Sequence, residues 1–186
     1  LGSWCWDKVN PHLSAAGYRP LAVDLPGRKN NVLAVEDVSL DAFVNYVLQV
    51  LDGLSEPATL VGHSLGGVTL SKVAELAPEH VRALVYVTAF LLRDGESARE
   101  ILLEDHSIVR SSRKISDDGL TSRLLDDKLR DALCADCSTD DVERARSLIV
   151  PEALAIARTP VHTTAKRFGH VPRFYIECLR DRIIPP

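Results

Sequence analysis

Hydrophobic and polar positions along the first half of the chain follow two alternating periods. Short apolar runs at residues 19–25, 58–61 and 81–88 are typical of buried strands. Between them the apolar positions repeat with the helical period. These helices are expected at residues 4–16, with Ser3 as a candidate N-cap and Gly17 as the stop, at 40–51 between Ser39 and Gly53, and from Gly66 to Ala77 before Pro78. This alternation predicts an α/β fold with a mostly parallel sheet and helices on both faces.

The second half of the chain has a different character. Residues 93–170 are richer in charge and predict only short helices, at 98–104, 120–133, 140–148 and 151–157. Residues 172–178 return to a strand pattern. We therefore expect a core at 1–92, a helical cap inserted at 93–170, and a return to the core at 171–186.

The composition is that of an ordinary globular protein. Of 186 residues, 46% are hydrophobic and 26% are charged, and the net charge is −4. No run of Lys or Arg suggests a nucleic acid or an anionic membrane as partner, and the apolar stretches are too short to span a bilayer. The chain begins at Leu1, contains no Met and ends soon after a strand-like segment. We expect it to be an internal piece of a longer protein.

The cysteine spacing offers one candidate metal or redox site. Cys134-x-x-Cys137 has the spacing of half a zinc site or of a redox pair. No second ligand pair follows at a fitting distance, and the motif does not begin a helix after a strand. We therefore expect Cys5, Cys134, Cys137 and Cys178 to be free thiols in a reducing compartment, with a cytoplasmic location, and we expect no metal or organic cofactor.

One pentapeptide carries the chemistry. Gly62-His63-Ser64-Leu65-Gly66 follows an apolar strand and precedes a helix, which is the context of a nucleophile elbow. In such a turn the serine hydroxyl projects above the sheet, and we expect both glycines to remove Cβ atoms that would collide. The motif predicts Ser64 as a nucleophile; the alternative is a glycine-rich turn with an incidental serine.

The neighbours of Ser64 have separate expected roles. The following helix aims its first N–H groups at the site of the developing negative charge, so the Leu65 N–H is the candidate oxyanion donor. His63 adjoins the nucleophile, but successive residues in a tight turn point in different directions. We expect His63 to pack or to orient other groups.

The acid of the site is expected after a later strand. Asp181 follows the strand at 172–178, and Pro185 prevents a helix from starting at once. Its role would be to orient a histidine and stabilise the imidazolium. The alternative is a surface aspartate paired with Arg180 or Arg182, and Asp94 is the weaker candidate for the acid.

No histidine is placed to act as the base, because none follows Asp181. The six histidines lie in or after helices, in the expected cap or at the amino end of the last strand: His12, His63, His80, His106, His162 and His170. We expect the catalytic histidine to lie outside these 186 residues.

With the elbow, the cap and the acid in place, the chain resembles the hydroxynitrile lyase and plant methylesterase branch of the α/β-hydrolases. Bacterial esterases of this branch, including those acting on salicylate and pyrethroid esters, look closer still. The matching segments are Gly2-Ser3-Trp4-Cys5-Trp6, Asp24-Leu25-Pro26-Gly27, Gly62-His63-Ser64-Leu65-Gly66-Gly67, and Tyr175-Ile176-Glu177 through Asp181-Arg182-Ile183-Ile184-Pro185. The resemblance implies a preceding strand that supplies a second oxyanion N–H, and a following strand and helix with the catalytic histidine. On this comparison the chain lacks both, and the 186 residues alone are expected to hydrolyse esters negligibly.

The resemblance implies serine-dependent hydrolysis of a carboxylic ester through an acyl-enzyme. Phe90 and Leu91, with Leu92, are candidates to line a pocket for a small hydrophobic or aromatic ester, although core packing explains them equally well. Two alternatives stay open: a hydroxynitrile lyase, whose deciding Lys would lie beyond Pro186, and a ligand receptor without turnover. A haloalkane dehalogenase is disfavoured because it needs Asp at the position of Ser64. The expected partner is a small-molecule ester, and homodimer formation stays open.

Overall fold

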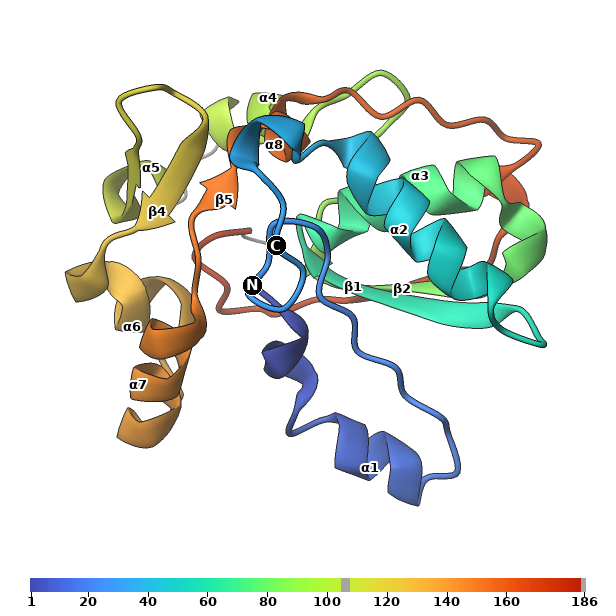
Figure 1. Cartoon of the computed structure of the whole chain (residues 1–186), viewed down its shortest axis with the longest axis horizontal. Helices are drawn as coiled ribbons and strands as arrows, with labels where there is room; N and C mark the ends of the chain where they lie inside the picture. Colours follow the sequence, from blue (N-terminus) through green and yellow to red (C-terminus); the bar gives the residue numbers. More distant parts are fainter. Residues whose placement is uncertain (105–107, 185–186) are drawn as a thin grey trace.

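A computed structural model describes residues 1–104 and 108–184 (Figure 1). Two residues used in the sequence analysis, His106 and Pro185, lie outside this described part. The helices in the described residues are all too short or too polar to cross a membrane.

The larger sheet carries the residues of chemical interest. It contains β1 (Ala58–Ser64), β2 (Val81–Ala89) and β6 (Arg173–Ile176) in the order β1-β2-β6, with both pairs parallel. All three strands were predicted, but β1 continues to the serine itself and β6 is shorter than expected. Because parallel strands end at the same edge of a sheet, the residues that follow them are brought together there.

Two helices pack against this sheet and form the main core. Helix α2 (Leu40–Asp52) begins at Ser39, whose Oγ accepts the Ala42 N–H at 3.1 Å, which confirms the predicted N-cap. Helix α3 (Gly66–Leu76) follows the nucleophile turn and packs against α2, β1 and β2. Both helices and β2 contribute fully buried apolar side chains to this core: Val44, Val68, Val73, Ala74 and Leu84.

The predicted first helix is wrong in its extent. A 3₁₀ turn, η1 (Ser3–Trp6), is followed by the short helix α1 (Asn10–Ala15). Pro11 lies in the first turn of α1, where its missing N–H costs nothing but where it prevents one continuous helix from forming. Ser3 is not the N-cap either, because its N–H and its hydroxyl both donate to the Asp24 carboxylate, at 2.7 and 2.9 Å.

The strand predicted at residues 19–25 is also wrong. Among the described residues this segment pairs with no other strand. Strand β1 pairs only with β2 within the described residues. A strand needs a neighbour for its backbone hydrogen bonds, and Leu21 is 64% exposed. The segment ends at Asp24, which accepts hydrogen bonds from Ser3 and Asn30. The loop at 26–38 was predicted and contains one 3₁₀ turn, η2 (Val35–Asp37).

The cap region is a mixture of strands and helices instead of the predicted helices alone. Its elements are α4 (Ala98–Glu104), α5 (Val109–Ser112), β3 (Arg113–Ile115), β4 (Thr121–Leu124), η4 (Asp126–Lys128), α6 (Leu129–Leu133), α7 (Thr139–Leu148), β5 (Glu152–Ala153) and α8 (Leu154–Arg158). Strands β3, β4 and β5 form a small antiparallel sheet. Two further 3₁₀ turns, η3 (Pro78–His80) and η5 (Phe168–His170), precede β2 and β6.

Two of the four predicted cap helices need correction. The helix expected at 120–133 is a strand in its first part, because Gly119, with φ +70°, turns the chain and residues 121–124 then alternate between inside and outside. The helix expected at 151–157 begins as β5, where Glu152 pairs with Ser122. Helices α4 and α7 lie where they were predicted, and Ser138 accepts the Asp141 N–H at the start of α7.

A buried ion pair joins the cap to the core. Arg28, in the loop after residue 25, donates through Nη2 to Glu152 Oε1 of β5 at 2.5 Å, and only 7% of the Arg28 side chain is exposed. The Arg28 guanidinium also lies 5.6 Å from the centre of the Phe43 ring of α2. In Figure 1, β5 faces the blue chain near the N-terminus, between the cap strands and α2.

Candidate active site

Ser64 lies at the junction of β1 and α3. Its φ is +54°, in the left-handed region that residues other than glycine seldom adopt, and Leu65 returns to the helical region before α3 begins at Gly66. Backbone strain of this kind costs about 1–3 kcal/mol and is concentrated at functional sites. This is the strand–turn–helix arrangement that the sequence predicted for the nucleophile.

Two glycines around the elbow permit close packing. A Cβ at Gly62 would lie 2.8 Å from Leu70 Cδ1, and a Cβ at Gly67 would lie 2.4 Å from the Phe90 carbonyl oxygen. Gly66 has nothing within 4 Å, so the expectation that both glycines of the pentapeptide prevent a collision is wrong for Gly66. The sequence reasoning overlooked Gly67, although the Gly-Gly pair at the start of a helix was a signal for a close approach.

The candidate oxyanion donor is the first amide after the serine. The Leu65 N–H has no acceptor among the described residues, as expected for a group at the N-terminal end of a helix. Leu65 packs its side chain partly against the core cluster. Its role as a donor to an oxyanion stays a prediction.

Asp181 is fixed by several hydrogen bonds. Its Oδ1 accepts the backbone N–H groups of Ile183 and Ile184 at 2.7 and 3.0 Å, and its Oδ2 accepts the Thr88 hydroxyl. Arg180 binds Asp136 instead, at 3.0 Å, and no ion pair joins Asp181 to an arginine within the described residues. The alternative of a surface aspartate paired with a neighbouring arginine is therefore not what the structure shows.

Sheet topology brings the two candidates to one edge. Ser64 ends β1, Asp181 follows β6, and β2 lies between these strands. Ala89, the last residue of β2, is the register partner of Ser64, and Phe90 N donates to the Ser64 carbonyl at 3.1 Å. The carboxyl end of β2 is thus in direct contact with the nucleophile turn on one side.

On its other side, β2 is bound to β6. The Tyr175 hydroxyl donates to the Ala89 carbonyl and accepts the Ala89 N–H, both at 3.1 Å, and burial raises the pKa of Tyr175. The Tyr86 hydroxyl oxygen lies 2.8 Å from Ser71 Oγ of α3, at hydrogen-bond distance. Burial raises the pKa of Tyr86 to about 12. Sequence reasoning missed these three side chains; a serine on the inner face of a strongly apolar helix was the available signal.

His63 adjoins Ser64 in the sequence, and its pKa is below that of an ordinary histidine. Burial, and next the N-terminal amine, lower its pKa, while the Asp181 carboxylate acts in the opposite direction. The remaining described histidines are elsewhere. His12 lies in α1 and His80 in η3. His162 Nδ1 lies 3.3 Å from Asp94 Oδ1 on an exposed loop, and His170 precedes β6 at its amino end. Asp94, the weaker candidate for the acid, is an exposed residue close to His162, and it accepts the Thr163 N–H.

The predicted pocket residues divide into two environments. Phe90 and Leu92 belong to the core cluster and are each 4% exposed, whereas 43% of Leu91 is exposed. Core packing therefore accounts for Phe90 and Leu92, and a role for Phe90 and Leu91 in binding an ester stays a prediction.

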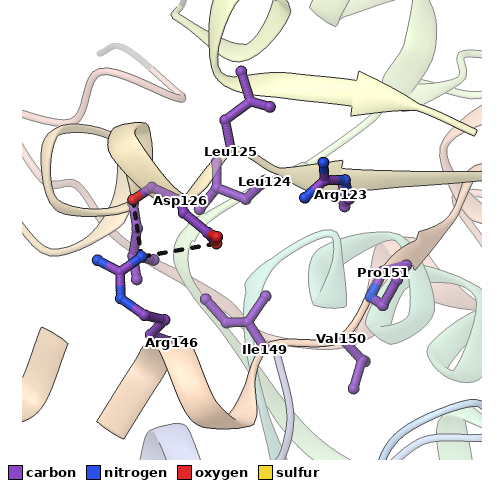
Figure 2. A pocket seen from close by; sticks show the side chains of 9 residues that line it. Arg123, Leu124, Leu125, Asp126, Arg146, Ile149, Val150 and Pro151 are labelled. Carbon is purple, nitrogen blue, oxygen red and sulfur yellow. Dashed lines mark hydrogen bonds and ion pairs between the residues drawn. The ribbon is translucent and has the colours of Figure 1, made fainter. Parts of the chain in front are cut away.

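A pocket in the cap is separate from these groups. Figure 2 shows Arg146 bound to both the backbone carbonyl and the side-chain carboxylate of Asp126. This pair of residues lies on one side of the pocket. The lining residues are Arg123, Leu124, Leu125, Asp126, Leu129, Arg146, Ile149, Val150 and Pro151. None of the candidate catalytic residues lines it.

The described residues contain no group of three or more His, Cys, Asp or Glu side chains placed to bind a metal ion. Cys5, Cys134, Cys137 and Cys178 are free thiols.

A strained serine between a strand and a helix, beside an aspartate after a later parallel strand, defines a hydrolase of the α/β class. The sequence matches the alpha/beta hydrolase family over residues 1–186, and the chain belongs to this family.

The relatives of this chain include a salicylic acid-binding protein and a methylesterase. It is 31% identical over 200 residues to "Salicylic acid-binding protein 2" of Nicotiana tabacum, covering 99% of this chain and 76% of that protein. It is 29% identical over 196 residues to "Methylesterase 9" of Arabidopsis thaliana, covering 97% and 76%.

Solved structures agree with this family assignment. Polyneuridine aldehyde esterase superimposes with a TM-score of 0.88 at 26% identity, covering 100% of this chain and 78% of that one. A pyrethroid hydrolase from Sphingobium faniae superimposes with a TM-score of 0.88 at 27% identity, covering 99% and 76%. The chain is a hydrolase of the α/β-hydrolase fold and spans about three quarters of the length of these relatives.

Proposed function

We propose that Ser64 is the nucleophile of a carboxylic ester hydrolase that works through an acyl-enzyme. The Ser64 hydroxyl passes its proton to a histidine outside the 186 residues as its oxygen attacks the acyl carbon, and the Leu65 N–H binds the oxyanion. The histidine then gives this proton to the leaving alcohol as the ester C–O bond breaks. Water then attacks the acyl-enzyme and releases the acid. The observation that carries this proposal is that the strained Ser64 and the multiply hydrogen-bonded Asp181 follow parallel strands to the same edge of the sheet.

Asp181 has the role of orienting the histidine and stabilising its protonated form. A carboxylate can do this only if it stays ionised and keeps one orientation. The two backbone N–H groups on Oδ1 and the hydroxyl on Oδ2 hold the carboxylate in one orientation.

The proposed substrate is a small hydrophobic or aromatic ester. Relatives named as methylesterases, as a salicylic acid-binding protein and as a pyrethroid hydrolase support this class. The exposed, apolar Leu91 next to the carboxyl end of β2 is a candidate contact for such a substrate. A cytoplasmic location, and the lack of nucleic-acid and membrane partners, stay predictions from the sequence.

The test uses the full-length protein with a short-chain p-nitrophenyl ester. We expect Ser64→Ala to lower kcat on the order of 10⁶-fold, as removal of a nucleophile does in other serine hydrolases. Asp181→Asn should lower kcat by about 10⁴-fold through loss of the correct histidine orientation. Circular dichroism and thermal unfolding of each variant check that the fold is intact.

Each outcome of this test has a defined meaning. Wild-type turnover in Ser64→Ala would exclude Ser64 as the nucleophile. Wild-type turnover in Asp181→Asn would assign the acid elsewhere. If the unmodified protein cleaves no ester, the proposal is wrong, and cyanohydrin cleavage would then distinguish a lyase from a receptor without turnover.

A further inference from the structure

Thr88 is an extra residue in β2, at the point where the strand passes Ser64. In the β1–β2 ladder, His63 pairs with Val87 and Ser64 pairs with Ala89, so Thr88 has no partner and forms a bulge. Its φ is +37°, outside the range that a β-branched residue adopts without strain. Bulges are frequent next to active sites, where they redirect a side chain.

The side chain of the bulged residue is directed at the candidate acid. Thr88 is 6% exposed, and its hydroxyl donates to Asp181 Oδ2. In a regular strand, successive side chains point to opposite faces, so the extra residue changes the direction in which residue 88 points. The residue with the strained backbone is thus the one whose hydroxyl donates a hydrogen bond to the Asp181 carboxylate.

The ends of the bulge are fixed on both sides. Both backbone polar groups of Ala89 bind the Tyr175 hydroxyl of β6, the strand that leads to Asp181. Phe90 N binds the Ser64 carbonyl on the other side. The residue between the nucleophile and the acid therefore cannot shift without breaking contacts to both strands.

Counting acceptor positions shows what the hydroxyl does for Asp181. An ionised carboxylate has about four lone-pair positions, two on each oxygen. Ile183 and Ile184 use both positions of Oδ1, and Thr88 uses one of Oδ2. One position on Oδ2 is then left to accept an imidazole N–H, so the Thr88 hydroxyl defines which lone pair of Asp181 is presented to the histidine.

We propose that Thr88 is a positioning residue for the catalytic acid: the bulge in β2 directs its hydroxyl at Asp181 Oδ2 and thereby fixes the direction in which Asp181 orients the histidine. The proposal rests on the proposed function, because it assigns Thr88 a task only if Asp181 is the acid. It goes further in giving the strained bulge a part in the reaction.

The test compares Thr88→Val with Thr88→Ser in the full-length protein. Valine keeps the β-branched shape and removes the hydroxyl, whereas serine keeps the hydroxyl. We expect kcat for a p-nitrophenyl ester to fall about 10- to 100-fold in Thr88→Val, the range for losing a hydrogen bond to a charged group. KM should stay unchanged, since the histidine acts in both acylation and deacylation and both steps slow together. Thr88→Ser should recover most of the lost kcat.

A matched control is available in the neighbouring helix. Thr69 in α3 is equally buried, and its hydroxyl has no hydrogen-bond partner in the described part of the chain. Thr69→Val therefore removes a buried hydroxyl without removing a hydrogen bond, and its kcat should match the wild type. Thermal unfolding midpoints of the Thr69 and Thr88 variants report any general loss of stability separately from kcat.

Three results would overturn the proposal. They are a wild-type kcat in Thr88→Val, an equal loss of kcat in Thr88→Val and Thr88→Ser, and a rise in KM that accounts for the whole change in kcat/KM. Asp181→Asn, measured in parallel, separates two failures: if it retains activity, the assignment of the acid is wrong, and if it is inactive while Thr88→Val is active, only the role of Thr88 is wrong.

Discussion

The carboxyl edge of the large sheet and the cap are built in different ways. At the sheet edge, two strained residues and a network of hydrogen bonds lie over a core whose central side chains are fully buried. The cap has a small cluster of its own, around Leu129 and Val142, and a sheet whose last strand, β5, has two residues. The main candidates, Ser64, Leu65 and Asp181, lie at the sheet edge, whereas Asp94, the weaker candidate for the acid, lies on an exposed loop of the cap.

This difference separates two tasks. A reaction needs its groups placed to within a fraction of an ångström, and a densely packed core with parallel strands provides that. The cap contacts the core through the buried Arg28–Glu152 pair and through apolar side chains such as Ala157 and Val161, which lie in the main core cluster. Surface contacts, among them those of Lys8 and Arg144, add to these. We infer that substitutions in the core change the chemistry, while those in the cap change stability and access.

The largest expected effect is on the contact between the two regions. Arg28→Met removes the side chain that donates to the buried Glu152, and removal of one member of a buried pair costs about 3–5 kcal/mol. Urea unfolding of the full-length protein measures this loss. Arg144→Met is the matched control, because the Arg144–Asp7 pair is exposed and should contribute about 0–1 kcal/mol. Equal effects of the two substitutions would show that the cap does not depend on the buried pair.

A smaller effect is expected inside the elbow. Gly67→Ala places a methyl group against the Phe90 carbonyl oxygen and should cost about 1–3 kcal/mol through overpacking, with a loss of kcat as the end of β2 moves. Gly66→Ala, one residue earlier, meets open space and should be neutral or stabilising by up to about 1 kcal/mol. Chemical unfolding and ester turnover are measured for both variants. If Gly67→Ala behaved like Gly66→Ala, the close approach of Gly67 to the Phe90 carbonyl oxygen would be contradicted.

A pH-dependent contribution is expected where α3 meets the segment before β6. Burial acts to raise the pKa of Glu75, but hydrogen bonds from Thr164 and Phe168 and the nearby Arg167 outweigh it and lower this pKa below its usual 4.5. A lowered pKa means that the stabilisation is complete above pH 4.5 and is lost as the pH falls through that value and through the folded-state pKa. Unfolding free energies of the wild type and Glu75→Gln should therefore converge on acidification; a constant difference would contradict this.

The smallest effect is expected at the surface of the cap. Lys8 binds Asp141 of α7 at 2.7 Å, but 76% of the Lys8 side chain is exposed. Lys8→Ala should cost at most about 1 kcal/mol, and added salt should reduce the difference from the wild type. Thermal unfolding at low and high salt measures it. A larger, salt-independent loss would mean that the contact between α7 and the N-terminal segment is more than a screened ion pair.

Elements with strong local signals were predictable from the sequence. The Ser39 cap and the helix after it, the strand before Ser64, and the Gly-x-Ser-x-Gly turn all depend on residues within a few positions of one another. Asp181 was predictable from its place after a strand, but its hydrogen-bond partners were not. The fold class and the nucleophile turn therefore follow from local patterns of apolar residues, serine and glycine.

Tertiary structure decided the remaining features, because they depend on which strands meet. Residues 19–25 have a strand pattern but no ladder partner in the described structure, and residues 121–124 became a strand because β3 and β5 lie beside them. Thr88 reads as an ordinary strand residue in the sequence. It becomes a strained bulge aimed at Asp181 only because β2 must match β1 at Ser64 and β6 at Tyr175 at the same time. Local sequence sets what a segment prefers, whereas pairing between distant segments sets where its side chains point.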